Sequence, residues 1–125
     1  MPVKRVLPYA VCLLALSGIA ACGSAAEPTP AHNATATVVR SLAITVTGTT
    51  VTPAPAQVDL GIGEALELTV TIDHDDELHA HGFGDLEEQL KAGVPTTVRL
   101  VGTETGVFEV ETHEPALTLL TVAVR

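Results

Sequence analysis

Two pairs of residues carry the side chains best suited to chemistry. His79 and His81 are separated by one residue, and so are Glu111 and His113. Residues two apart in a β-strand point to the same face, with Cα atoms about 6.5–7 Å apart, so the members of each pair share a direction. Imidazole and carboxylate ligands without sulfur suit Cu(II) or Zn(II), and a planar arrangement favours Cu(II). We therefore expect a metal site of His79, His81, Glu111 and His113, if the two strands lie side by side.

The same residues also have an interpretation that needs no metal. Histidines on a solvated strand face can hydrogen-bond Glu or Asp across the sheet, and nearby carboxylates favour the protonated ring. A metal would require the neutral imidazole, so its occupancy should fall as the pH drops through about 6. The pattern leaves both interpretations open.

Other chemistries find little support. The acidic run 73–77 is not an EF-hand loop, because Leu78 and Gly84 stand where Gly and Glu are required. No Ser lies in a Gly-x-Ser-x-Gly elbow, and the Gly61-x-Gly63 pair lacks the further Gly of a phosphate-binding loop. We expect a protein that is not an enzyme.

Alternating apolar residues predict that these side chains are positioned by strands. The clearest example is 66–72, where Leu66, Leu68, Val70 and Ile72 alternate with Glu and Thr. Short strands separated by turns are typical of an all-β, two-sheet antiparallel sandwich. The expected strands cover residues 42–46, 58–62, 66–72, 77–83, 98–101, 107–112 and 119–124. Segment 85–91 fits a short helix or a strand, because Leu86 and Leu90 suit both periods.

The N-terminus predicts export and a lipid anchor. Lys4 and Arg5 precede an apolar run that is shorter than the roughly 20 residues of a membrane span. The sequence Ile-Ala-Ala-Cys22 resembles the processing box of bacterial lipoproteins, which implies that Cys22 carries a diacylglycerol. The alternative is an ordinary secretory signal followed by an incidental Cys. The expected organisation is a signal peptide at 1–21, a lipidated flexible tether at 22–40 and a folded domain at 41–125, at the outer face of the cytoplasmic membrane or in the periplasm.

The charge balance restricts the partners. Without residues 1–21, the remaining 104 residues hold four basic and 15 acidic side chains, a net charge of −11. Nucleic acid and anionic headgroups are therefore disfavoured, whereas a basic protein partner fits. Cys12 falls in the removed segment and Cys22 is committed to lipid, so the folded part has no thiol for a disulfide or a metal.

The domain resembles the small bacterial cupredoxin-like domains. The resemblance covers 41–125 and rests on the Gly-x-Gly-Glu turn, the His-x-His-Gly motif and the strand Gly-x-Phe-Glu-Val-Glu-x-His. It implies an exported Greek-key β-sandwich in which segment 85–91 is a strand. It also implies that the strands of the two His-bearing motifs are neighbours.

The resemblance further implies how this chain departs from blue-copper proteins. His79 or His81 matches the upstream His of the family, and Glu111 stands where the family has its Cys. His113 follows, and Leu117 or Leu119 occupies the vicinity of the family's Met. Without the thiolate, blue-copper electron transfer is disfavoured. The expected function is metal handling, with copper favoured and zinc second, or a metal-free interaction module with no cofactor.

Overall fold

The part of the chain that the structure describes forms nine strands. The structure is a computed structural model, and it describes residues 36–125. The strands are β1 (Thr37–Thr47), β2 (Thr50–Thr52), β3 (Gln57–Leu60), β4 (Glu64–Ile72), β5 (Asp76–Ala80), β6 (Leu86–Leu90), β7 (Thr96–Val101), β8 (Gly106–His113) and β9 (Ala116–Val124). Residues 36–125 contain no helix, and therefore none that is long and apolar enough to cross a membrane.

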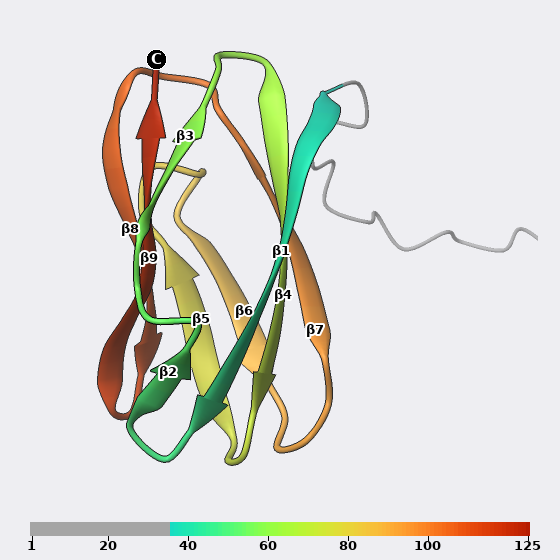
Figure 1. The fold of residues 1–125 in the computed structure, drawn as a ribbon, viewed down its shortest axis with the longest axis vertical. Helices are drawn as coiled ribbons and strands as arrows, with labels where there is room; N and C mark the ends of the chain where they lie inside the picture. The colour runs from blue at the N-terminus through green and yellow to red at the C-terminus, as the bar shows by residue number, and fades with distance from the viewer. Residues whose placement is uncertain (1–35) are drawn as a thin grey trace, which may run out of the picture.

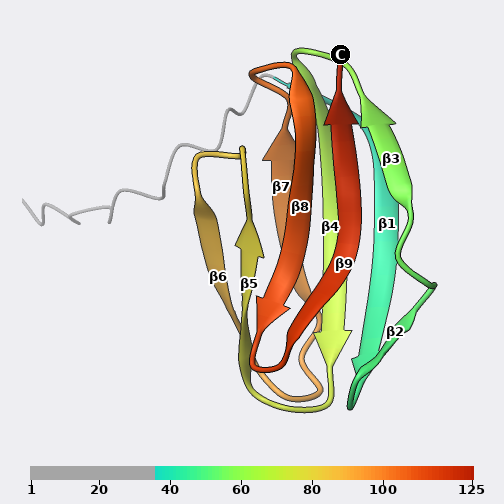
Figure 2. The same cartoon turned by 90° about the vertical axis from the view of Figure 1, so that its left-hand side faces the viewer.

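The strands form two sheets that pack face to face (Figure 1). One sheet has the order β2-β1-β4-β7, and the other has the order β3-β9-β8-β5-β6. Figure 2 shows the second sheet face-on, with β5 and β8 side by side near its middle. The predicted all-β sandwich is confirmed. Two strand pairs, β1 with β4 and β3 with β9, are parallel, so both sheets are mixed.

The core lies between the sheets and explains which side chains face outward. On β4 the even-numbered residues from Leu66 to Ile72 are at most 1 % exposed, as their alternation predicts. On β5 and β8 the inward residues are Leu78, Ala80, Val110 and Thr112, all fully buried. Because neighbours along a strand alternate in direction, the residues between them face solvent.

The ambiguous segment is a strand. β6 spans Leu86–Leu90 and pairs antiparallel with β5, with Leu90 buried in the core. Its backbone pairs with β5 at every residue from Leu86 to Leu90, which decides for the strand. The strand that the resemblance implies for 85–91 is therefore present.

The expected N-terminal segments lie largely outside the described residues. The predicted signal peptide at 1–21, Cys22 and most of the tether fall in residues 1–35, which the structure does not describe. The last residues of the expected tether, 37–40, are the beginning of β1. They pair with the start of β4, so the sheet begins four residues before Ser41.

Candidate metal centre

The strands of the two His-bearing motifs are neighbours. β5 and β8 pair antiparallel, and His79 lies directly opposite Glu111. Residues directly opposite in an antiparallel pair have Cβ atoms about 4.5–5.5 Å apart and point to the same face. The inward Leu78 and Thr112 form the neighbouring pair and are buried, which fixes His79 and Glu111 on the outer face.

Three of the four predicted ligands lie together on this face. One ligand atom each of His79, His81 and Glu111 lie within 4.8 Å of one another. The His81 Nε2 atom is 3.1 Å from Glu111 Oε1, and the rings of His79 and His81 have centroids 4.1 Å apart at a tilt of 44°. Two ligand atoms on one zinc ion are about 3.3 Å apart at Zn–N and Zn–O distances of 2.0–2.2 Å. Modest side-chain rotations would close the group around one ion.

His81 is held by the turn that follows β5. Its backbone N–H donates to the Glu109 carbonyl at 3.0 Å, which extends the pairing of β5 with β8 by one residue. Gly82 then adopts φ +73, a left-handed conformation that favours glycine, and the Phe108 ring packs directly over it. Phe83 and Phe108 form an edge-to-face pair at 5.7 Å. The turn that carries His81 is therefore pinned to β8.

The fourth predicted ligand, His113, is not part of this group. It shares the outer face with Glu111, but it lies two residues further along β8. Its Nδ1 atom is 3.7 Å from Glu77 Oε1, and its side chain is 64 % exposed. This pair lines a separate surface pocket of about 210 Å³ together with Asp75, Asp76, Gln89 and Glu114.

The register identifies one outward residue that the sequence did not single out. Glu87 on β6 lies directly opposite His79, on the side of β5 away from Glu111. The signal was present in the strand interpretation of 85–91, which leaves Glu87 on the face opposite Leu86 and Leu90. His79 is thus flanked by a carboxylate on each neighbouring strand.

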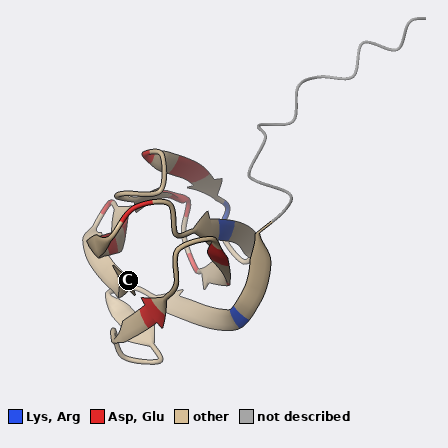
Figure 3. Cartoon of the chain, turned by 90° about the horizontal axis from the view of Figure 1, so that it is seen from above, with Lys and Arg blue, Asp and Glu red and all other residues tan. Residues whose placement is uncertain are grey.

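The surroundings of the group are negatively charged. The described residues include 14 acidic and four basic side chains. Seen from above in Figure 3, acidic residues recur around the sandwich, whereas basic residues are few and separate. Lys91 and Arg125 pair with Asp75 and Asp59 at 3.0 and 2.8 Å, away from the three candidate ligands. The potential at this face therefore favours a cation.

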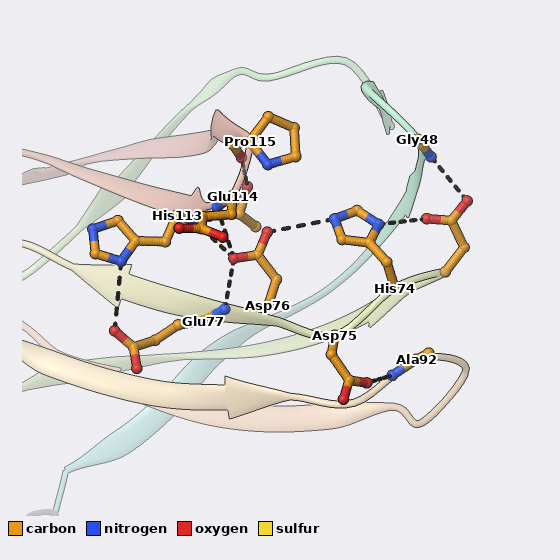
Figure 4. A network of polar contacts seen from close by, with 11 residues as sticks. Gly48, His74, Asp75, Asp76, Glu77, Ala92, His113, Glu114 and Pro115 are labelled. Atoms are coloured by element: carbon orange, nitrogen blue, oxygen red, sulfur yellow. Dashed lines mark hydrogen bonds and ion pairs between the residues drawn. The ribbon is translucent and has the colours of Figure 1, made fainter.

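A second polar network lies at the end of the sandwich and has a different role (Figure 4). The Asp76 side chain is 1 % exposed, and its Oδ1 accepts backbone N–H groups of Glu77, His113 and Glu114 at 2.7, 3.1 and 2.9 Å. Burial by itself raises the pKa of Asp76, but these hydrogen bonds outweigh it and hold the pKa below its usual value. Asp76 thereby fastens the start of β5 to the β8–β9 turn.

His74 connects this network to the β1–β2 turn. Its Nδ1 is 2.7 Å from Asp73 Oδ1 and its Nε2 is 3.5 Å from Asp76 Oδ2, while Asp73 Oδ2 accepts the Gly48 N–H at 2.9 Å. The hydrogen bond to Asp73 raises the pKa of His74 and lowers that of Asp73. The network joins the β1–β2, β4–β5 and β8–β9 turns, so its role is to stabilise this end of the sandwich.

The donor set of the candidate centre fits some metals and not others. Two imidazoles and one carboxylate suit Cu(II) or Zn(II). A blue-copper centre does not fit, because residues 36–125 contain neither Cys nor Met. Leu119, near the position where the resemblance places a Met, is buried in the core.

Comparisons with known proteins show the fold. No family model matches the sequence, and no curated protein matches it either. One similar solved structure is of a heme-copper terminal oxidase dimer, with a TM-score of 0.53 and 14 % identity over 69 % of this chain. Another is the blue copper oxidase from Nitrosomonas europaea, with a TM-score of 0.56 and 14 % identity over 79 % of this chain. The chain spans 65 % and 47 % of the lengths of those two chains. Its fold is a cupredoxin-like β-sandwich.

Proposed function

We propose that this protein binds one divalent metal ion, copper in preference to zinc, through His79, His81 and Glu111. The observation that carries the proposal is the approach of these three donor groups to within 4.8 Å on the outer face of one sheet. β5, the turn that follows it and β8 supply them, and His81 and Glu111 are 30 residues apart in the chain, so the group depends on the fold. Cu(II) is preferred because nitrogen and oxygen sites bind it more tightly than Zn(II).

The exposure of the site favours metal handling over catalysis. The side chains of His81 and Glu111 are 46 % and 28 % exposed. An ion bound there by three protein ligands would keep coordination positions that face water, and a partner could supply a ligand to them. We propose that the protein handles or delivers the ion, without turnover and without blue-copper electron transfer.

The proposed compartment is the cell envelope. The predicted signal peptide and Cys22 support a protein held by lipid at the outer face of the cytoplasmic membrane or in the periplasm. The two structural neighbours, one from a heme-copper terminal oxidase dimer and one a blue copper oxidase, agree with a copper-related role. A tether would leave the acidic domain free to meet a basic partner.

A second candidate function is a metal-free interaction module of the envelope. The observation that favours it is the direct contact of His81 with Glu111 at 3.1 Å, which satisfies both groups without an ion. In that case the face would be an acidic surface with an internal ion pair, and association with a basic partner would weaken as salt is added.

A titration separates the two functions. Cu(II) and Zn(II) are titrated into the wild-type protein and into His79→Ala, His81→Ala and His113→Ala, with heat and spectral change as readouts. The proposal expects one ion per chain, an affinity lowered about 100-fold or more by the first two substitutions, and little change for His113→Ala. If His79→Ala and His81→Ala both bind the ion with the affinity of the wild type, the proposal is contradicted and the metal-free module is favoured.

A further inference from the structure

Glu87 is an outward carboxylate beside the candidate centre that no other described residue contacts through a hydrogen bond or ion pair. It lies on the edge strand β6, directly opposite His79, and it is exposed. It makes no hydrogen bond or ion pair with any other residue of the described range 36–125. Three outward carboxylates on the neighbouring strands β5 and β8 do have partners, namely Glu77 with Gln89, Glu109 with Thr118 and Glu111 with His81.

His79 is placed between two carboxylates that lie on opposite sides of it. Glu111 is its partner on β8, and Glu87 is its partner on β6. The contact of His81 Nε2 with Glu111 at 3.1 Å shows that the candidate ligands converge on the β8 side of β5. An ion shared by the three ligands would therefore lie on that side of His79.

When one ring nitrogen of His79 binds an ion, the other ring nitrogen needs a hydrogen-bond acceptor on the β6 side. The two ring nitrogens point away from each other, so a nitrogen that binds an ion toward β8 leaves the other N–H directed toward β6. Metal-binding histidines regularly donate this second N–H to a carboxylate or carbonyl, which fixes the tautomer and the ring orientation and makes the ligand more basic. Cβ atoms about 4.5–5.5 Å apart place a Glu side chain within reach of that N–H.

We propose that Glu87 is a positioning residue that accepts the second ring N–H of His79 when the ion is bound. This inference rests on the proposed metal-binding function and adds to it a residue that does not touch the ion. Glu87 selects which ring nitrogen of His79 coordinates and holds the ring in that orientation. It also provides negative charge next to the ligand that a cation polarises.

The chain offers a matched control on the same strand. Glu88 is also exposed and carries the same charge, but it lies opposite Leu78, whose side chain is in the core. The Glu88 side chain therefore leaves β6 on the other face. Removing either carboxylate changes the net charge equally, so a difference between the two variants reports position instead of charge.

The first test is a titration with Zn(II) alone. Glu87→Ala is expected to weaken binding about 10-fold, within the 10–100-fold range found when such outer partners of metal ligands are removed. Glu87→Gln keeps an acceptor oxygen and should recover part of the affinity, whereas Glu88→Ala should match the wild type within about twofold. His79→Ala and His81→Ala are included so that the site itself is tested in the same series.

The second test is a readout that a merely structural role would not change. Nitrogen-15 NMR of the Zn(II)-loaded protein identifies the coordinating ring nitrogen of His79 and the proton on the other one. In the wild type and in Glu88→Ala this N–H should be protected from exchange with water, and in Glu87→Ala the protection should be lost.

The outcomes distinguish the two proposals. If Glu87→Ala and Glu88→Ala bind Zn(II) equally well while His79→Ala and His81→Ala lose it, the role of Glu87 is wrong and the metal site stands. If His79→Ala and His81→Ala bind like the wild type, or the wild type binds neither Zn(II) nor Cu(II), the metal site is wrong and the role of Glu87 falls with it.

Discussion

The Asp76 network allows the sharpest prediction about stability. Asp76→Ala removes a carboxylate that is 1 % exposed and accepts three backbone N–H groups. A hydrogen bond to a charged group contributes about 1.5–3 kcal/mol, which would give a large sum. Two of the donors come from exposed residues, His113 at the end of β8 and Glu114 in the turn that follows, and can be rehydrated. The cost of burying the carboxylate is also relieved. We therefore expect a loss of about 3 kcal/mol in the free energy of unfolding.

The assay is urea unfolding of the wild type, Asp76→Ala, Asp76→Asn and Asp75→Ala. Asp76→Asn keeps an acceptor oxygen without the charge and should lose about half as much as Asp76→Ala. Asp75 is the control, because its 62 % exposed side chain contacts Lys91 and the Ala92 N–H at the surface, and such exposed pairs contribute little to stability. In thermal unfolding, 3 kcal/mol corresponds to roughly 12–24 °C for a domain of this size.

Acid should remove the same contribution. The pKa of Asp76 is lowered in the folded protein, so its stabilising effect is present above the unfolded value of about 3.9 and is lost as the pH falls through the folded value. The difference between the wild type and Asp76→Asn should shrink below about pH 4. An Asp76→Ala variant as stable as Asp75→Ala at pH 7 would show that the buried carboxylate does not stabilise the fold.

Three further predictions concern the turns and the core. The pKa of His74 is raised in the folded protein, so the protonated ring stabilises the fold below the unfolded value of about 6.5. This contribution is lost as the pH rises through the folded value. His74→Gln should therefore remove the decline in unfolding free energy between about pH 6 and 8. Gly82→Ala should destabilise the protein by about 1–3 kcal/mol more than Gly84→Ala in urea unfolding, because both glycines have φ +73 but only at Gly82 would a Cβ collide with Phe108. Equal losses would show that the Phe108 contact is unimportant. Thr112→Val should cost about 1 kcal/mol in the same assay, because the buried hydroxyl donates a 2.8 Å hydrogen bond to a backbone carbonyl, and an unchanged midpoint would contradict this.

The sequence predicted the strands well where one face is buried. In β4 the alternation of Leu66, Leu68, Val70 and Ile72 is unbroken, and the core covers those residues in the structure. Segment 85–91 was undecided, because apolar residues four apart satisfy the period of a helix and that of a strand equally. Pairing with β5 decides it, and such pairing depends on residues far away in the chain.

The candidate site was predictable in part, for a related reason. Alternation along a strand determines which face a side chain occupies. On that basis, together with the neighbouring strands that the resemblance implies, four residues were grouped: His79, His81, Glu111 and His113. Parity does not determine the position along the strand at which two strands meet. The register places Glu111 opposite His79 and leaves His113 beside Glu77. The same register places Glu87 opposite His79, a position that the sequence did not indicate.

The pairing of His79 with His81 and Glu111 is tested most directly by locating the ion. Crystals of the Cu(II)- or Zn(II)-loaded protein, measured on both sides of the metal absorption edge, give the position of the metal from its anomalous scattering. We expect one strong peak about 2.0–2.2 Å from a ring nitrogen of His79, a ring nitrogen of His81 and a carboxylate oxygen of Glu111. A peak beside Glu77 and His113 instead, or no peak on this face of the sheet, would contradict it.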